Sequence, residues 1–150
     1  MENNKPKQKK EKKEIYPKPE INDLVNMFIN IYFTAMTNKN LEIIENLVKE
    51  PKTGKIYTKI NYMQKIMAQE EIIEYFEHLF SSNIEYNIKD ILTVPKGERY
   101  ISILVTGEMK IELNSENKNF VQYFNIETLW NAKEKLCNYW IESIMHTYIF

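Results

Sequence analysis

The sequence predicts an α+β fold in which three helices accompany a meander of antiparallel strands. In three segments before Ser81, apolar residues recur every three or four positions, which is the period of an amphipathic helix. After Ser81 the apolar period changes to two, which is typical of strands. The connections between these later strands are short, so we expect the strands to pair as antiparallel neighbours. A chain of 150 residues is long enough for one compact domain, which we assign to residues 21–150.

Three amphipathic helices are expected. The first begins after Pro19 and runs for about five turns. The second is short, with Asn40 as its N-cap and with Pro51 and Gly54 ending it. The third begins at Gln69. The expected buried stripes are Ile21, Leu24, Val25, Phe28, Ile29 and Tyr32 in the first helix, Leu41, Ile44, Leu47 and Val48 in the second, and Ile72, Ile73, Phe76, Leu79 and Phe80 in the third.

One strand is expected between the second and third helices, at residues 55–62. The meander then begins with the alternation of Ile84, Tyr86 and Ile88 and turns at Pro95–Gly97. Three long strands follow, at residues 100–113, 120–130 and 136–148.

The long strands carry apolar residues on both faces. One face is expected to cover the helices, and it includes Ile101, Ile103, Val105, Phe120, Phe124 and Ile126. The opposite face is expected to carry Tyr86, Leu104, Tyr123 and Leu129. Because monomers rarely leave a large apolar patch in water, this second face is predicted to bind a partner.

Composition excludes several classes of protein. The formal net charge of −1 argues against a strongly basic nucleic-acid binder. The single cysteine excludes a disulfide framework and a cysteine-rich metal site. No apolar run approaches the ~18 residues of a membrane span, and the N-terminus has no apolar segment of a secretory signal. We therefore expect an intracellular protein with no membrane partner.

Residues 1–20 differ from the rest, because they are rich in lysine and nearly devoid of apolar side chains. Such a segment buries too little surface to offset its ordering entropy, so it is interpreted as a flexible tail. Its net charge is +3, whereas the remaining chain carries −4. The tail is either a nuclear-import or weakly RNA-contacting segment or a solvated arm with no partner, and direct RNA contact is expected from no other part of the chain.

Residues suited to catalysis are few and scattered. His78 is expected to be a solvated surface residue, whereas His146 is interpreted as a core or interface residue, with general base as the alternative. Cys137 is expected to be a small buried hydrophobe. The sequence contains no metal-binding spacing and no glycine-rich nucleotide loop. We therefore predict no catalytic, cofactor-binding or metal-binding residues, no cofactor, and a protein that is not an enzyme.

Four segments resemble the nuclear transport factor 2 family. They are FINIYFTAM (28–36), AQEEIIEYFEHLFSS (68–82), VTGEMKI (105–111) and FVQYFNI (120–126), and the likeness covers residues 21–148. The resemblance implies a cone-like fold with three helices wrapped by a strongly curved antiparallel sheet. In that fold Phe120 and Phe124 would fill the core beneath the helices, and Gly107 would mark a bend or bulge.

Within the family, residues 28–36 and 74–90 look closest to the small cofactors that heterodimerise with the large mRNA-export receptor. The resemblance implies binding, sheet face against sheet face, to the related domain of that receptor. It implies partner contacts at Ile84, Tyr86, Leu104, Tyr123 and Met145. It also implies nucleoporin Phe-Gly repeats as partners through the complex, and a location at the nucleus and nuclear pore with shuttling to the cytoplasm.

Two other functions occur on the same fold. One is a homodimeric carrier of Ran-GDP for nuclear import; the turn TVPKGE (93–98) offers no counterpart of the acidic rim that binds Ran. A separate departure from the family as a whole is the C-terminal stretch SIMHTYIF (143–150), which has neither the Asp nor the Arg usual there, so the salt bridge that this Arg often makes to the partner is not expected. The other is a small isomerase or dehydratase, which needs an acid or His inside the cone beside a Tyr or Asp hydrogen-bond donor.

Overall fold

The computed structural model describes residues 19–112 and 116–149, so residues 1–18 of the expected tail lie outside the described residues. It contains the three predicted helices, α2 (Ile21–Thr37), α3 (Leu41–Val48) and α4 (Ile72–Phe80), the last preceded by a 3-10 turn at Gln69–Glu71. The predicted cap of α3 is confirmed, because the Asn40 side chain accepts a hydrogen bond from the Ile43 N–H at 3.3 Å. The α2 stripe is buried as predicted, except that Ile21 at its start is exposed.

Six strands form one sheet in the order β2-β1-β6-β5-β4-β3. They are β1 (Lys59–Tyr62), β2 (Lys65–Ile66), β3 (Ile84–Lys96), β4 (Tyr100–Ile111), β5 (Lys118–Asn131) and β6 (Leu136–Ile149). Strands β3 to β6 form the predicted antiparallel meander. The sheet as a whole is mixed, because β1 pairs in parallel with β6. Short connections predict only antiparallel neighbours, so this long-range pair escaped the sequence analysis.

Several strand boundaries differ from the prediction by one residue or more, among them those of β3 and β1. The expected turn at Pro95–Gly97 begins only at Gly97, because β3 continues through Lys96 opposite Tyr100. The expected strand at 55–62 is regular only from Lys59 onward, while Ile56 forms an isolated bridge with Lys49. The short strand β2, which pairs with β1, was not predicted.

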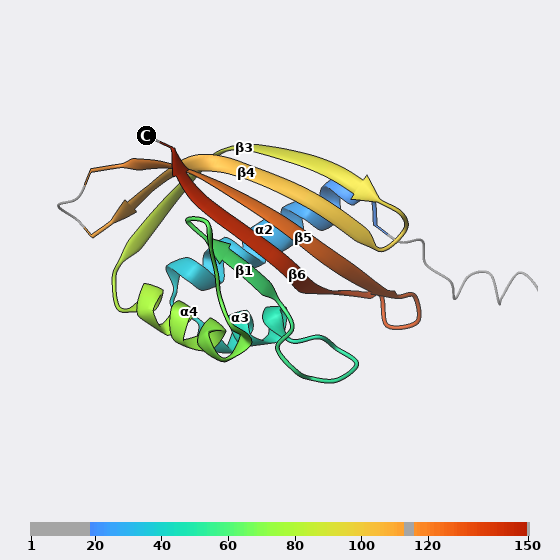
Figure 1. Cartoon of the computed structure of the whole chain (residues 1–150). Helices are drawn as coiled ribbons and strands as arrows, with labels where there is room; N and C mark the ends of the chain where they lie inside the picture. The colour runs from blue at the N-terminus through green and yellow to red at the C-terminus, as the bar shows by residue number, and fades with distance from the viewer. Residues whose placement is uncertain (1–18, 113–115, 150) are drawn as a thin grey trace, which may run out of the picture.

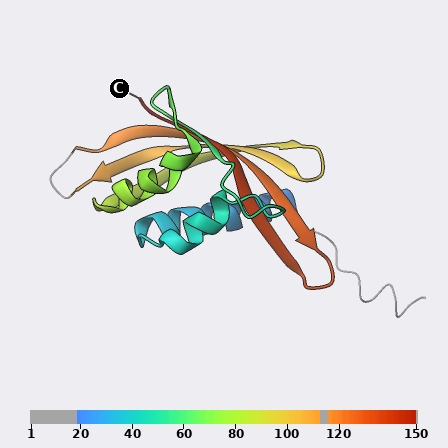
Figure 2. The same ribbon diagram turned by 60° about the horizontal axis from the view of Figure 1, so that its bottom comes forward.

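The sheet curves around the helices, as the cone-like fold requires. In Figure 1, α2 lies behind the sheet, and Figure 2 shows the three helices on one side of it. We call the side toward the helices the inner face and the opposite side the outer face. The core lies between the helices and the inner face.

Aromatic rings join α2 to the inner face. Phe124 packs edge-on against Phe28 and Tyr32 of α2, with ring centroids 5.4 and 5.0 Å apart. Phe120 packs beside Phe33, with centroids 6.4 Å apart. Both Phe120 and Phe124 are fully buried, which confirms their predicted place beneath the helices. Such ring pairs add stability beyond their buried area.

Gly107 in β4 lies opposite an irregularity in β3. The register between these strands shifts between Ile88 and Asp90, so one extra residue is accommodated in β3. A Cβ atom at Gly107 would overlap the carbonyl oxygen of Asn87. Glycine is therefore required here by the close approach of the two backbones, and the bulge predicted at this point is confirmed.

Candidate binding surface on the outer face of the sheet

The outer face carries a row of side chains that crosses all six strands. Successive strands place these residues directly opposite one another, in the order Leu92, Leu104, Tyr123, Met145, Asn61 and Ile66. We call this set the cross-strand row. The exposed fractions of Leu92, Met145 and Ile66 are 58%, 48% and 76%, so much apolar surface is in contact with water. An exposed and largely apolar row of this kind, with Asn61 as its one amide, indicates a binding surface.

Three of the five predicted contact residues lie together in this row. Leu104, Tyr123 and Met145 are direct cross-strand neighbours on the outer face. Ile84 and Tyr86 are instead on the inner face, where Ile84 is buried in the core and Tyr86 packs against it. The predicted outer position of Tyr86 is therefore wrong.

The bulge in β3 explains this difference. Before the bulge, the side chains of Ile84, Tyr86 and Ile88 face inward. After it the phase is reversed, because Ile91 packs inward and Leu92 lies opposite Leu104 on the outer face. Sequence reasoning therefore missed Leu92. The signal for it was present in the glycine at 107, whose close approach to β3 marks the extra residue.

A hydrogen-bonded polar row runs beside the cross-strand row. The Ser102 hydroxyl donates to Asn125 Oδ1 at 2.6 Å, and Asn125 Nδ2 donates to Ser143 Oγ at 2.8 Å. These three residues form the floor of a hollow of about 580 Å³, whose walls include Tyr57, Lys59, Lys96, Tyr100, Trp140 and Glu142. The side chains on the floor satisfy one another, so covering them would leave few unpaired polar groups.

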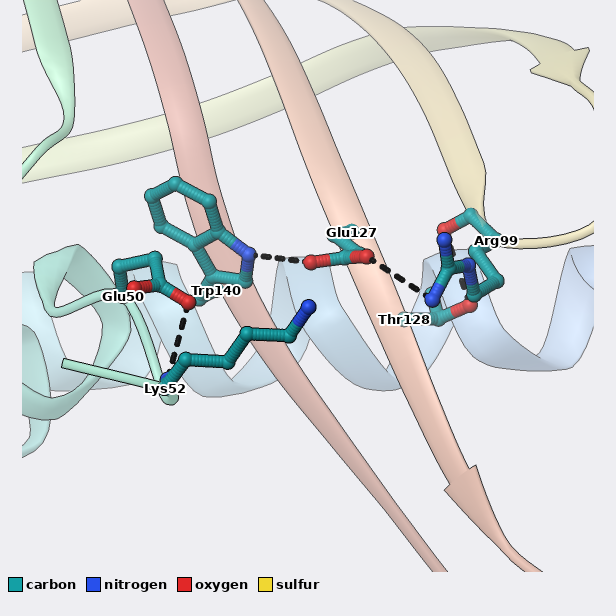
Figure 3. Close-up of polar contacts among 6 residues, drawn as sticks. All are labelled: Glu50, Lys52, Arg99, Glu127, Thr128 and Trp140. Carbon is teal, nitrogen blue, oxygen red and sulfur yellow. Dashed lines mark hydrogen bonds and ion pairs between the residues drawn. The ribbon is translucent and has the colours of Figure 1, made fainter.

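Glu127 organises the charged end of the outer face, as Figure 3 shows. Its Oε1 accepts a hydrogen bond of 2.7 Å from Trp140 Nε1, and its Oε2 lies 3.7 Å from an Arg99 nitrogen. The Glu127 side chain is only 13% exposed, so this carboxylate is held between an indole and a guanidinium. Its negative charge raises the pKa of Tyr100.

The loop that follows α3 is held by Glu50, which also appears in Figure 3. Glu50 Oε1 accepts a hydrogen bond of 2.9 Å from the Lys52 backbone N–H. This bond, with those from Thr53, lowers the pKa of Glu50. In the lining of the hollow itself, burial and then the charge of Glu127 raise the pKa of Glu142. The hollow therefore combines aromatic walls with charges of both signs.

The inner face contains one buried histidine, as the sequence favoured. His146 is 2% exposed, and its Nδ1 lies 2.8 Å from Gln122 Nε2. Its ring stacks between Tyr62 and Phe120, with interplanar angles of 8° and 15°. Tyr148 meets the ring edge-on, and burial lowers the pKa of His146 to about 4. His146 is thus a neutral core residue at neutral pH.

His78 and Cys137, the other two residues considered for catalysis, lie outside the cross-strand row. His78 is exposed on α4, as predicted, and Cys137 is half-buried against the edge of the core. Within residues 19–112 and 116–149, no three His, Cys, Asp or Glu side chains are grouped so as to hold a metal ion. None of the helices in this part of the chain is both long and apolar enough to cross a membrane.

Comparison with known proteins identifies the family. Residues 24–145 match the Nuclear transport factor 2 (NTF2) domain. The chain belongs to the NTF2 domain family. Among curated proteins, no match is found.

Solved structures share the NTF2 fold. Nuclear transport factor 2 from Cryptosporidium parvum superimposes with a TM-score of 0.69 at 15% identity, covering 90% of this chain and 99% of its own. The complex of yeast deubiquitinase Ubp3 with the Bre5 cofactor gives 0.66 at 14% identity, covering 88% and 99%. A putative ketosteroid isomerase from Shewanella frigidimarina NCIMB 400 gives 0.62 at 9% identity, covering 79% and 90%. At these identities the likeness is one of fold, and this NTF2-like fold serves proteins of different activities.

Proposed function

We propose that this NTF2-family chain is a non-enzymatic subunit that binds a related NTF2-like domain through its outer sheet face. The observation that carries the proposal is the cross-strand row, in which Leu104, Tyr123 and Met145 lie side by side. Two sheets that pack face to face interdigitate such side chains at a separation of about 10 Å. A related domain with its own curved sheet has the shape that this surface needs.

The polar row beside Leu104 and Tyr123 supports burial of this face in a complex. The side chains of Ser102, Asn125 and Ser143 form hydrogen bonds with one another. A partner that covers them therefore does not have to supply new hydrogen bonds in place of those made by water. The charges of Lys59, Lys96 and Glu142 around the hollow would lie toward the rim of such an interface. Interfaces commonly combine an apolar centre with a polar rim in this way.

The proposed partner is the related domain of an mRNA-export receptor, and the proposed role is to support passage of mRNA through the nuclear pore. The resemblance of residues 28–36 and 74–90 to the small export cofactors favours this partner over Ran-GDP. Contact with nucleoporin Phe-Gly repeats would occur through the complex. The protein would then work at the nucleus and the nuclear pore and shuttle to the cytoplasm.

The packing of the interior supports a non-enzymatic role. The His146 side chain is buried and lies nearly parallel to the rings of Tyr62 and Phe120, so the imidazole is not exposed to a substrate in solvent. Among the described residues, the buried polar side chains are Thr58, Ser102, Gln122, Thr128 and His146, and none is a carboxylate. An isomerase or dehydratase on this fold would need such an acid or an accessible histidine.

Light scattering tests the proposal directly. The molar mass of the purified chain is measured alone and after mixing with the NTF2-like domain of an mRNA-export receptor. We expect a 1:1 complex on mixing, with no stable homodimer of the chain alone. A homodimer that ignores the receptor domain would contradict the proposal and favour the Ran-GDP carrier, for which retention of Ran-GDP would then be measured.

A further inference from the structure

The edge strand β3 has an open segment of backbone at one end. β3 lies at the end of the strand order and pairs only with β4 among the described strands. Glu112 N donates to Asn83 O at 2.8 Å and Asn83 N donates to Glu112 Oε1 at 3.2 Å, so the backbones of residues 83 and 112 face each other across the two strands. Because hydrogen-bonded pairs alternate along antiparallel strands, the N–H and C=O groups of Ile84, Tyr86 and Ile88 point away from β4. These groups are therefore directed to the free edge of the sheet.

Beyond Ile88, the same edge is interrupted. The bulge between Ile88 and Asp90 breaks the regular spacing. The Asp90 side chain then accepts the Ile91 N–H at 3.0 Å, and Pro95 has no N–H to donate. A bulge, a charge and a proline are devices that protect edge strands from pairing. Residues 84–88 contain neither a bulge nor a proline, and their one charged side chain, Glu85, is exposed.

A hollow of about 400 Å³ lies beside this open segment, between α2 and β3. Its apolar lining is formed by Ile29, Phe33, Tyr86 and Ile88. Its rim on α2 consists of amides and hydroxyls, namely Asn26, Asn30, Thr34, Thr37 and Asn38. No residue of the lining carries a charge, so an uncharged side chain would suit it, whereas a charged one would lose water without gaining a counter-ion.

We infer that residues 84–88 of β3 and this hollow bind a short extended segment of a partner protein as an additional strand. The backbone of that segment would bond to the free N–H and C=O groups around Tyr86. One aromatic or branched apolar side chain would enter the hollow against Phe33, and alternate side chains would point to the outer side. The amide and hydroxyl rim on α2 is suited to a segment without charge. This site is independent of the cross-strand row used in the proposed function.

A synthetic peptide provides the probe. It is an acetylated and amidated heptapeptide that alternates threonine with valine and carries one central phenylalanine in place of a valine. Amide hydrogen exchange of the full chain is followed by NMR with and without saturating peptide. We expect exchange at the Tyr86 and Ile88 amides to slow by at least tenfold, with little change at Asn87, whose N–H already faces β4. The same peptide with N-methyl groups on alternate peptide nitrogens should not bind.

Two matched variants test the hollow. Asn30→Arg adds a charge and bulk to the rim and is expected to weaken peptide binding by at least tenfold. Asn22→Arg makes the same exchange at an exposed position of α2 outside the hollow and should change binding by less than twofold. Saturable peptide binding without slowed exchange at Tyr86 and Ile88, or no binding at 1 mM peptide, would overturn the inference. So would protection of these amides that rises with protein concentration alone, since it would indicate pairing with a second copy.

Discussion

The ring of Tyr86 packs edge-on against the ring of Phe33, with centroids 5.1 Å apart and planes at 65°. This contact joins the edge strand β3 to α2, and it turns Tyr86 away from the outer face. Tyr86 also meets Phe120 with centroids 5.9 Å apart, and burial raises its pKa. Its hydroxyl therefore stays protonated at all ordinary pH values. The residue contributes to folding rather than to the cross-strand row.

Replacement of Tyr86 should therefore cost stability. We expect Tyr86→Ala to lower the free energy of unfolding by about 3 kcal/mol, because it removes the ring that fills the space between Phe33 and Phe120. Tyr123→Ala, on the outer face, should cost no more than about 1 kcal/mol, the value of a cross-strand pair. Urea unfolding of both variants measures the difference. Equal costs would contradict the inward position of Tyr86.

The position of Tyr86 marks the limit of what alternation predicts. A period of two gives the faces of a strand only while the register is unbroken. Between Ile88 and Asp90 one extra residue reverses the faces, so Tyr86 and Leu92 lie on opposite sides although both have even numbers. In β4 and β5, where the register is regular, Leu104 and Tyr123 were predicted on the correct face.

The helices were the most predictable elements, because local signals define them. Asn40 begins α3 as predicted, since its cap is made within three residues. The pairing of β1 with β6 was not predictable in this way. It joins Tyr62 to His146 across α4 and the whole meander, and no local pattern encodes such a contact. The stacking of the same two rings likewise became visible only in the structure.

Gly107 offers a second test of the sheet. Gly107→Ala should destabilise the protein by about 3 kcal/mol, because the added Cβ overlaps the Asn87 carbonyl and the two backbones must separate. Gly97→Asn is the control. Gly97 has a φ of +75° and open space around it, and asparagine tolerates this conformation, so a cost below about 1 kcal/mol is expected. Thermal and urea unfolding provide the comparison, and a harmless Gly107→Ala would contradict the close approach.

His146 should make stability depend on pH. Its pKa falls from an ordinary 6.5 to about 4 in the folded protein, because burial disfavours the charged ring. Between these values the unfolded chain binds the proton more readily, so stability falls as the pH is lowered from 6.5 toward 4. The expected loss is roughly 3 kcal/mol. Urea unfolding at several pH values measures it.

Two histidine variants test whether His146 causes this dependence of stability on pH. His146→Phe removes the titrating group but retains a ring between Tyr62 and Phe120, so the loss below pH 6.5 should shrink by most of that amount. His78→Gln changes an exposed residue and should leave the pH profile as it is in the unaltered protein. A His146→Phe profile that overlays the unaltered one would show that other groups cause the dependence.

Met145 and Met27 form a matched pair for testing the outer face. Their exposed fractions are 48% and 46%, but Met145 lies in the cross-strand row and Met27 on α2. Met145→Glu should weaken association with the related domain by several kcal/mol, because a charge would be buried against apolar side chains of the partner. Met27→Glu should leave association unchanged, and neither variant should unfold the chain, since both side chains are already exposed to solvent.

Light scattering and calorimetric titration measure the association of both variants with the related domain. Normal association of the Met145→Glu variant would exclude the cross-strand row as the interface, whereas equal weakening by both variants would indicate a general effect of added negative charge.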